Sequence, residues 1–245
     1  MSELVFVGTS DAFGAGGRRQ SAMLLRGRMG SALLDCGTTT CTGLSALGIP
    51  RSEIDAIVVS HFHADHFGGI PTFLLAATYE DRRRHHLRIA GPRGVESRVR
   101  AAAAALGHSF EDRQFPFPLS FQELPVGADH EVGPLRVRTF ETKHQSDSNP
   151  HGLSFEAGPT RIVFSGDTGW FEGLPAQVRG ADLFVCECTF STPQFEYHLS
   201  LEELTQQRGR FDCARMILTH LGESMAGRRG SCGFETADDG LVVKL

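Results

Sequence analysis

The chain has 245 residues, of which 40% are hydrophobic and 22% are charged, and its formal net charge is −5. This is an ordinary globular composition, and the acidic balance gives no global reason to expect nucleic-acid binding, which usually accompanies a basic excess. No apolar run approaches the roughly 18 residues that a membrane span needs, and residues 1–7 lack the basic start and cleavage site of a secretory signal. The six cysteines have no dense, regular spacing. They favour reduced thiols, so we expect a cytoplasmic protein without membrane contact.

Short strands and helices alternate through the first half of the chain. Strands are predicted at Leu4–Val7, Ser21–Arg26, Ser31–Asp35, Ile54–Val59 and Leu87–Ala90. Helices are predicted at Thr39–Leu47, Ile70–Arg84 and Gly94–Leu106. The strand at 54–59 is an apolar, β-branched run, which is typical of a strand buried on both faces.

A loop-like stretch, Gly107–Asp129, with a short strand at Leu119–Leu124, precedes a second half of the same kind. Strands are then predicted at Leu135–Phe140, Gly152–Glu156, Ile162–Ser165, Leu183–Cys188, Met216–Thr219 and Leu241–Lys244. A helix is predicted at Leu201–Gln207, with Ser200 and Glu203 forming a capping box. Two mixed halves in one domain, residues 1–245, would bury both sets of strands as sheets packed face to face with helices outside.

Histidine and carboxylate side chains follow four of these strands. Open α/β architectures place ligand sites at the carboxyl ends of strands, so the side chains are expected to converge. Imidazole and carboxylate are the donors that zinc-type metals prefer, and two metals about 3.5–4 Å apart can activate water between them. We therefore predict two divalent metal ions, zinc first, although manganese or iron would accept the same donors. The donors are His61, His63, Asp65, His66, His144, Asp167 and His220.

Some of these residues have a plainer interpretation when each is taken alone. Gly166-Asp167-Thr168-Gly169 is also a good turn sequence, and His220 could be a histidine of the core. A polar loop that only meets solvent is a poor explanation for four potential ligands within six residues, His61 to His66, directly after a buried strand. The shared position at strand ends favours the metal site.

The run His61-Phe62-His63-Ala64-Asp65-His66 resembles the signature of the metallo-β-lactamase fold superfamily, and the resemblance extends from Gly8 through Asp35 to His220. It implies an α/β protein (α+β in some schemes), a four-layer αββα sandwich of two mixed β-sheets flanked by helices. Asp35 would orient a ligand histidine, or would simply end a strand in a turn. The resemblance assigns His61, His63 and His144 to a first metal and Asp65, His66 and His220 to a second, with Asp167 bridging.

Within the superfamily, the chain most resembles the branch that holds ribonuclease Z and the small cyclic phosphodiesterases. Three segments carry this resemblance: Val7–Ser10 with Arg18–Ser21, Cys186–Phe190, and Tyr197–Ser200. By that resemblance His198 would stabilise or protonate the leaving group and Glu187 would position it, so that Asp65, His198 and Glu187 form the expected catalytic set. The plainer alternative is that His198 faces solvent at the start of a helix.

The expected function is hydrolysis of a phosphodiester, in a small molecule or a short nucleic acid, by a hydroxide that two metals activate. Ribonuclease Z enzymes of the usual kind carry a long arm that grips transfer RNA between the ligands matching His144 and Asp167. Here that interval holds only a short loop, Gln145–Pro150, and two strands. A ribonuclease Z-like endonuclease is therefore an alternative, not the first expectation.

Three further alternatives stay open. One is a carbonyl hydrolase acting on a β-lactam, lactone or thioester, which the segments around Glu187 and His198 disfavour. Another is a di-iron redox protein of the same fold, which would carry a glutamate where His63 stands. The third is a non-enzyme, a metal-binding scaffold or nucleic-acid-binding module that only keeps the fold.

Other features have two interpretations each. The basic patch Arg82–His86 can hold a phosphate, but solvated cations at a helix end explain it better. The phenylalanines of 110–121 can form a lid or a homodimer surface, although packing of an irregular segment onto the core is the simpler expectation. Trp170 follows the Asp167 turn and either lines the site entrance or packs against the core.

Overall fold

Two seven-stranded sheets form the centre of the computed structural model, which describes residues 2–110 and 113–245. Three residues lie outside the described residues: Met1, in the stretch 1–7 where the sequence predicts no secretory signal, and Glu111 and Asp112, in the predicted loop Gly107–Asp129. The first sheet has the order β14-β1-β2-β3-β4-β5-β6, and the second has the order β13-β12-β11-β10-β9-β8-β7.

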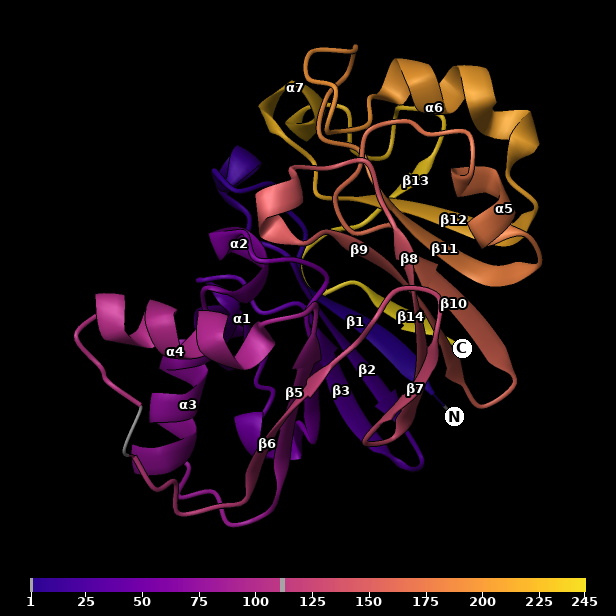
Figure 1. Cartoon of the computed structure of the whole chain (residues 1–245). Coiled ribbons are helices and arrows are strands. Elements are labelled where there is room, and N and C mark those ends of the chain that lie inside the picture. The colour runs from indigo at the N-terminus through magenta and orange to yellow at the C-terminus, as the bar shows by residue number, and fades with distance from the viewer. Residues whose placement is uncertain (1, 111–112) are drawn as a thin grey trace.

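The strands of the first sheet are β14 (Val242–Lys244), β1 (Glu3–Gly8), β2 (Ala22–Gly27), β3 (Gly30–Leu34), β4 (Ala56–Val58), β5 (Leu87–Gly91) and β6 (Leu119–Glu123). Those of the second are β13 (Glu235–Thr236), β12 (Cys213–Thr219), β11 (Ala181–Glu187), β10 (Thr160–Phe164), β9 (His151–Ala157), β8 (Leu135–Glu141) and β7 (Asp129–Val132). Each sheet is mixed, with β3 to β6 parallel in the first and β10 to β13 parallel in the second. The C-terminal strand β14 pairs with β1, so the yellow end of the chain lies beside the indigo start in Figure 1.

Helices cover the outer faces of both sheets. The helices are α1 (Thr40–Ala46), α2 (Ala64–Phe67), α3 (Ile70–Tyr79), α4 (Val95–Ala105), α5 (Leu174–Val178), α6 (Leu201–Gln207) and α7 (Glu223–Ala226). Figure 1 shows α1, α3 and α4 outside the first sheet and α5 and α6 outside the second. The predicted four-layer αββα sandwich is confirmed. In the part of the chain that the structure describes, no helix is long and apolar enough to cross a bilayer.

Strand alternation produces the layers, because successive side chains of a strand point to opposite faces. Along β1, Leu4 and Phe6 belong to the core between the two sheets, whereas Val5 and Val7 pack beneath the helices of the first half. A third core, including Val163 and Phe184, lies beneath the helices of the second half. Since both faces of each sheet are buried, the sheets are rigid supports for the loops at their ends.

The helix predicted at Ile70–Arg84 is shorter than expected. It ends at Tyr79, and Arg82 has a left-handed φ of 46°, which helical backbone cannot accommodate. The Arg83 side chain is buried instead of solvated, and its guanidinium donates to the carbonyls of His85 and His86 at 3.0 and 2.7 Å. The sequence shows five polar residues in a row, Arg82–His86. It does not show that the side chain of Arg83 turns inward and hydrogen-bonds the backbone carbonyls that follow the helix.

The phenylalanines of 110–121 pack against the first core. Phe110 and Phe117 are buried, and Phe115 and Phe121 are partly buried against the same cluster. This confirms the packing interpretation for these rings. The capping box of α6 is also confirmed, since the Ser200 hydroxyl accepts from the backbone N–H of Glu203 and the Glu203 carboxylate accepts from that of Ser200.

Candidate metal centre and active-site cavity

One edge of the sandwich, where β3, β4, β8, β10 and β12 end, brings together all seven predicted donors. The run 61–66 leaves β4 and enters α2, and the other donors follow β8, β10 and β12 directly. Two groups result. The first cluster is His61, His63, His144 and Asp167, and the second cluster is Asp65, His66, Asp167 and His220.

The donor atoms of each cluster lie at the spacing of ligands around one ion. In the first cluster, the Nδ1 of His63 lies 3.2 Å from the Nε2 of His61 and 3.0 Å from the Nε2 of His144. In the second, the Nε2 of His66 lies 3.3 Å from the Nε2 of His220 and 3.3 Å from a carboxylate oxygen of Asp65. Zinc–nitrogen bonds of about 2.0–2.1 Å in a tetrahedron place neighbouring donors about 3.3 Å apart, so both clusters fit such an ion.

Asp167 is shared by the two clusters through different contacts. Its Oδ2 lies 3.7 Å from the Nε2 of His61 and 3.5 Å from that of His220, and its Oδ1 lies 3.3 Å from the Nε2 of His66. Asp167 is buried, yet its Oδ1 has no hydrogen bond of acceptable geometry from any described residue. A buried, unpaired carboxylate oxygen is costly, and a cation in the cluster would remove that cost.

Buried hydroxyl and carboxylate groups fix the orientation of the ligand histidines. The Nδ1 of His66 donates to Oδ2 of Asp35 at 2.7 Å, and the Ser60 hydroxyl, which lies 3.0 Å from the same oxygen, accepts from the Nδ1 of His61 at 3.1 Å. On the opposite side, the hydroxyl of Thr189 accepts a hydrogen bond from the Nδ1 of His220 at 3.0 Å. With Nδ1 carrying the proton, Nε2 is left with a lone pair that points at the cluster.

His144 is oriented in the same way by a backbone group, since its Nδ1 donates to the carbonyl of Tyr197 at 2.9 Å. Asp35 therefore lies where the resemblance expected it. The hydroxyls of Ser60 and Thr189 were not predicted, because a single serine or threonine beside a ligand has no distinguishing pattern in sequence.

Electrostatics differ between the two clusters. Burial lowers the pKa of His61, His63 and His144, so these imidazoles stay in the neutral form that binds metal. Burial also lowers the pKa of His66 and His220, but nearby carboxylates, Asp167 first, outweigh it and raise both above the ordinary value. The second cluster thus attracts positive charge.

His198 and Glu187 form a hydrogen-bonded pair at the edge of the clusters. The Nδ1 of His198 donates to Oε1 of Glu187 at 2.9 Å, and the fully buried Glu187 also accepts from the backbone N–H groups of Thr168 and Thr189. Burial lowers the pKa of His198, but the Glu187 charge and hydrogen bond raise it to about 9. His198 lines the cavity and does not simply face solvent, so the plainer alternative for it is wrong.

Two buried residues of the centre have a left-handed backbone, Asp35 with φ 59° and His220 with φ 54°. Non-glycine residues rarely adopt this conformation, and at functional sites the surrounding structure holds them in it. Here it turns the chain sharply at the ends of β3 and β12, which aims each side chain along the sheet edge. Asp35 is the last residue of the predicted strand Ser31–Asp35, and His220 directly follows the predicted strand Met216–Thr219, but the turn itself is set by tertiary contacts.

The clusters open into a cavity of about 700 Å³. Only part of the lining of this cavity was predicted from the sequence. Besides the donors, its lining includes Phe13, Gln145, Phe195 and Glu223. Trp170 is not among the lining residues; it packs against Phe211 and beneath the guanidinium of Arg210, so it takes the packing role of its two interpretations.

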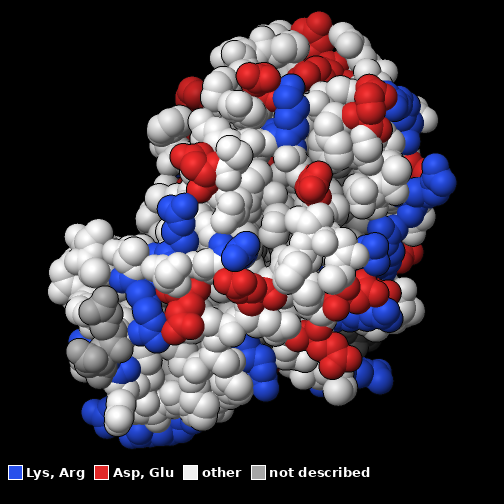
Figure 2. Space-filling model, in the orientation of Figure 1, with Lys and Arg blue, Asp and Glu red and all other residues white. Residues whose placement is uncertain are grey.

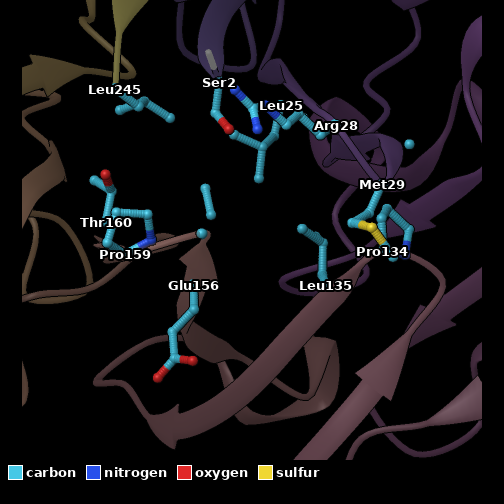
Figure 3. A pocket seen from close by; sticks show the side chains of 14 residues that line it. Ser2, Leu25, Arg28, Met29, Pro134, Leu135, Glu156, Pro159, Thr160 and Leu245 are labelled. Atoms are coloured by element: carbon cyan, nitrogen blue, oxygen red, sulfur yellow. The ribbon is translucent and has the colours of Figure 1, made fainter.

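A second cavity, about 520 Å³, lies at the opposite end of the strands, beside the β2–β3 turn that precedes β3. Figure 3 shows apolar side chains such as Leu25, Leu135 and Leu245 around it, with Arg28 and Glu156 at its sides. This lining holds one carboxylate and no histidine or cysteine. Among residues 2–110 and 113–245, every group of donors that could hold a metal ion therefore lies at the first cavity.

Comparison with known proteins agrees with the geometry. Residues 2–237 match the family model described as Anti-Pycsar protein Apyc1. The chain is 27% identical to the Anti-Pycsar protein Apyc1 of Bacillus phage 010DV004 over 234 residues, covering 91% of this chain and 90% of the relative. It is also 27% identical to the ribonuclease Z of Mycobacterium sp. (strain KMS) over 241 residues, covering 90% and 84%.

A solved structure has the same fold. The crystal structure of the metallo-β-lactamase fold protein YhfI from Bacillus subtilis superposes with a TM-score of 0.79 at 20% identity, and both chains are covered completely. The metallo-β-lactamase fold and the hydrolase class are thereby established. The chain belongs to the Anti-Pycsar protein Apyc1 family, and it is a metal-dependent hydrolase of the metallo-β-lactamase fold.

Proposed function

We propose that this chain is a phosphodiesterase that works with two divalent metal ions, zinc in the first instance, held by the first and second clusters. The observation that carries the proposal is the convergence of seven donors into two groups that share Asp167, beside the pair His198–Glu187. When bound, two such ions lower the pKa of water to about 7 and neutralise charge on a phosphate.

The chain's own residues then orient the reactants and handle the proton. Glu187 holds the Nδ1–H of His198, so the Nε2 of His198 is the nitrogen that can donate to the departing oxygen. A His198 pKa raised to about 9 keeps that proton on the ring near neutral pH. Asp65, which lines the cavity, lies 3.2 Å from the Nε2 of His220, so these two donors would hold the second-cluster ion together at the cavity floor.

Small or flexible diesters are the proposed substrates. Among the described residues that line the cavity, none is a lysine or an arginine. On the face drawn in Figure 2, positive and negative side chains are interspersed, which is unlike the continuous basic surface that grips folded RNA. The segment between His144 and Asp167 contains only a short 3₁₀ turn, Ser146–Ser148, and the hairpin of β9 and β10. The ribonuclease Z relatives, which by name cleave RNA, support the diester bond as the target.

Residues 1–245 are proposed to act as one domain, because neither half holds a complete site. His61, His63, Asp65 and His66 come from the first sheet's edge, whereas the other donors come from the second. Separating the sheets would separate the ligands of each ion.

The test compares kcat/KM of the metal-loaded, metal-analysed chain on bis(p-nitrophenyl) phosphate, p-nitrophenyl phosphate, a β-lactam, a lactone and precursor transfer RNA. We expect the diester to be cleaved best and the β-lactam and precursor transfer RNA poorly. His63→Ala should remove first-cluster metal and most activity, whereas His108→Ala, which changes an exposed histidine outside the cavity, should not. Faster turnover of the β-lactam or lactone than of every diester would refute the substrate class.

A further inference from the structure

Two exposed phenylalanines border the active-site cavity. Phe13 is 93% exposed and Phe195 is 44% exposed, and both line the cavity that contains His63 and His198. A single exposed apolar side chain is common on protein surfaces and needs no explanation. Two at the mouth of one cavity form an apolar surface that a bound molecule would cover.

The backbone beneath Phe13 is fixed although its ring is free. The Asp11 carboxylate accepts from the backbone N–H of Phe13 at 3.1 Å and from that of Ala15 at 3.2 Å. Ser10 forms an isolated parallel β-bridge with Leu221, the residue after the ligand His220. The loop is therefore attached beside the metal centre, and the backbone of Phe13 keeps a constant place relative to the donors while its ring can turn toward the cavity.

Phe195 is held against the catalytic pair. Its ring lies 5.2 Å from the ring of Tyr197 in an edge-to-face arrangement, and 6.1 Å from the His198 imidazole at a tilt of 33°. The carbonyl of Tyr197 orients the ligand His144. A group stacked on Phe195 would thus lie beside the nitrogen that serves the leaving group.

The polar lining indicates what such a group would carry. Gln145 and Gln194 line the cavity, and a side-chain amide offers both a donor and an acceptor to the edge of a heterocycle. Asp11 and Glu223 add negative charge to the mouth, and no lysine or arginine of the described lining offsets it. Within the described lining, only the metal centre would attract an anion, so a second phosphate near Asp11 and Glu223 would be repelled.

We propose that Phe13 and Phe195 form an aromatic subsite that receives the flat ring of the substrate, a nucleobase or aryl group, while the phosphate lies at the clusters. This inference rests on the proposed function and deepens it. Stacking on aromatic faces tolerates any base, because every base has a flat π-face.

The test uses two diesters with the same ring-free leaving group, the 2,2,2-trifluoroethyl ester of thymidine 5′-phosphate and methyl 2,2,2-trifluoroethyl phosphate, and follows the release of trifluoroethanol by fluorine NMR. The ratio of their kcat/KM values cancels differences in leaving-group chemistry and in the amount of active protein. In Phe13→Ala, and separately in Phe195→Ala, the ratio should fall about 5- to 100-fold, as loss of one base–aromatic stack implies. Phe13→Trp, which keeps an aromatic ring at this position, should keep the ratio near its wild-type value. Met29→Ala, an 86% exposed side chain at the other cavity, should leave the ratio unchanged.

A ratio that stays constant in both alanine variants, even if both substrates slow together, contradicts the aromatic subsite while leaving the phosphodiesterase proposal intact. A wild-type chain that cleaves neither diester contradicts the proposed function instead. In that event a binding measurement still tests the subsite. Calorimetry on the metal-loaded chain should show that thymidine 5′-monophosphate binds Phe13→Ala about 5- to 100-fold more weakly than the wild type. Equal affinities would refute the aromatic subsite.

Discussion

Asp35→Asn is the substitution that most directly separates the orientation of a ligand from the ligand itself. Asp35 touches no cluster atom that faces the cavity, yet its Oδ2 accepts from the Nδ1 of His66 at 2.7 Å and from the Ser60 hydroxyl at 3.0 Å. An asparagine amide placed there donates a proton where the carboxylate accepted one. His66 would then hold its proton on Nε2, the nitrogen that faces the second cluster. Ser60, which also fixes His61, would lose its acceptor.

The fold should tolerate this change. Asparagine adopts a left-handed backbone more readily than most residues, so the φ of 59° at position 35 is accessible to it. Its side-chain oxygen can still accept from the backbone N–H of Ser60, which lies 2.7 Å from Oδ1 of Asp35. Loss of a group that orients a metal ligand typically weakens metal affinity by about 10- to 100-fold, which corresponds to about 1.4–2.7 kcal/mol.

The assay is competition for zinc between the protein and a chromophoric chelator, with circular dichroism to check folding. Asp55→Asn is a matched control, because Asp55 accepts from the backbone N–H of Ser31 at the other end of the same sheet and touches no histidine. Zinc affinity of Asp35→Asn within twofold of the wild type, with the fold intact, would refute the orientation argument. An equal loss in Asp55→Asn would show that the effect is not specific.

Three further outcomes follow from the structure. His198→Ala should keep its metal while kcat on a diester falls by about 10²- to 10⁴-fold, and metal analysis of the purified variant separates this from a lost ligand. Burial lowers the pKa of His151 to about 4, below its unfolded value, so the unfolded chain gains a proton first as the pH falls from 6.5 to 4. Over that pH window the free energy of unfolding of the wild type should therefore fall by up to about 3 kcal/mol more than that of His151→Gln. Urea titrations at several pH values measure both. Ser200→Ala removes the capping box of α6 and should cost about 1 kcal/mol, read as a lower urea midpoint with an unchanged slope.

The sequence predicted those parts of the fold that depend on local pattern. Apolar runs marked the central strands, as Leu4–Val7 marked β1 and Ile54–Val59 marked β4. Ligand candidates were recognisable because each follows a buried strand directly, as His220 follows β12. Strand pairing across long sequence distances, such as β14 with β1, was beyond such patterns, because it depends on tertiary packing.

The parts of the site that were not predicted are those that depend on loops. The Asp11 carboxylate organises the turn that carries Phe13, but an isolated aspartate after a serine is indistinguishable from a surface residue in sequence. The early end of α3 was missed for a similar reason, since its cause is the inward turn of Arg83 towards two carbonyls. Local propensity favours continuing that helix, and tertiary contacts override it.

Two metal ions, held by two clusters that share Asp167, are proposed to make this chain a phosphodiesterase, and one titration tests this most directly. The chelated, metal-free chain is titrated with zinc or manganese while bound metal per chain and kcat/KM on bis(p-nitrophenyl) phosphate are measured on the same samples. We predict no cleavage without metal and a rise in rate that levels off at about two ions per chain. Diester cleavage by the metal-free chain, or a well-folded chain that binds no metal across the titration, would contradict the account.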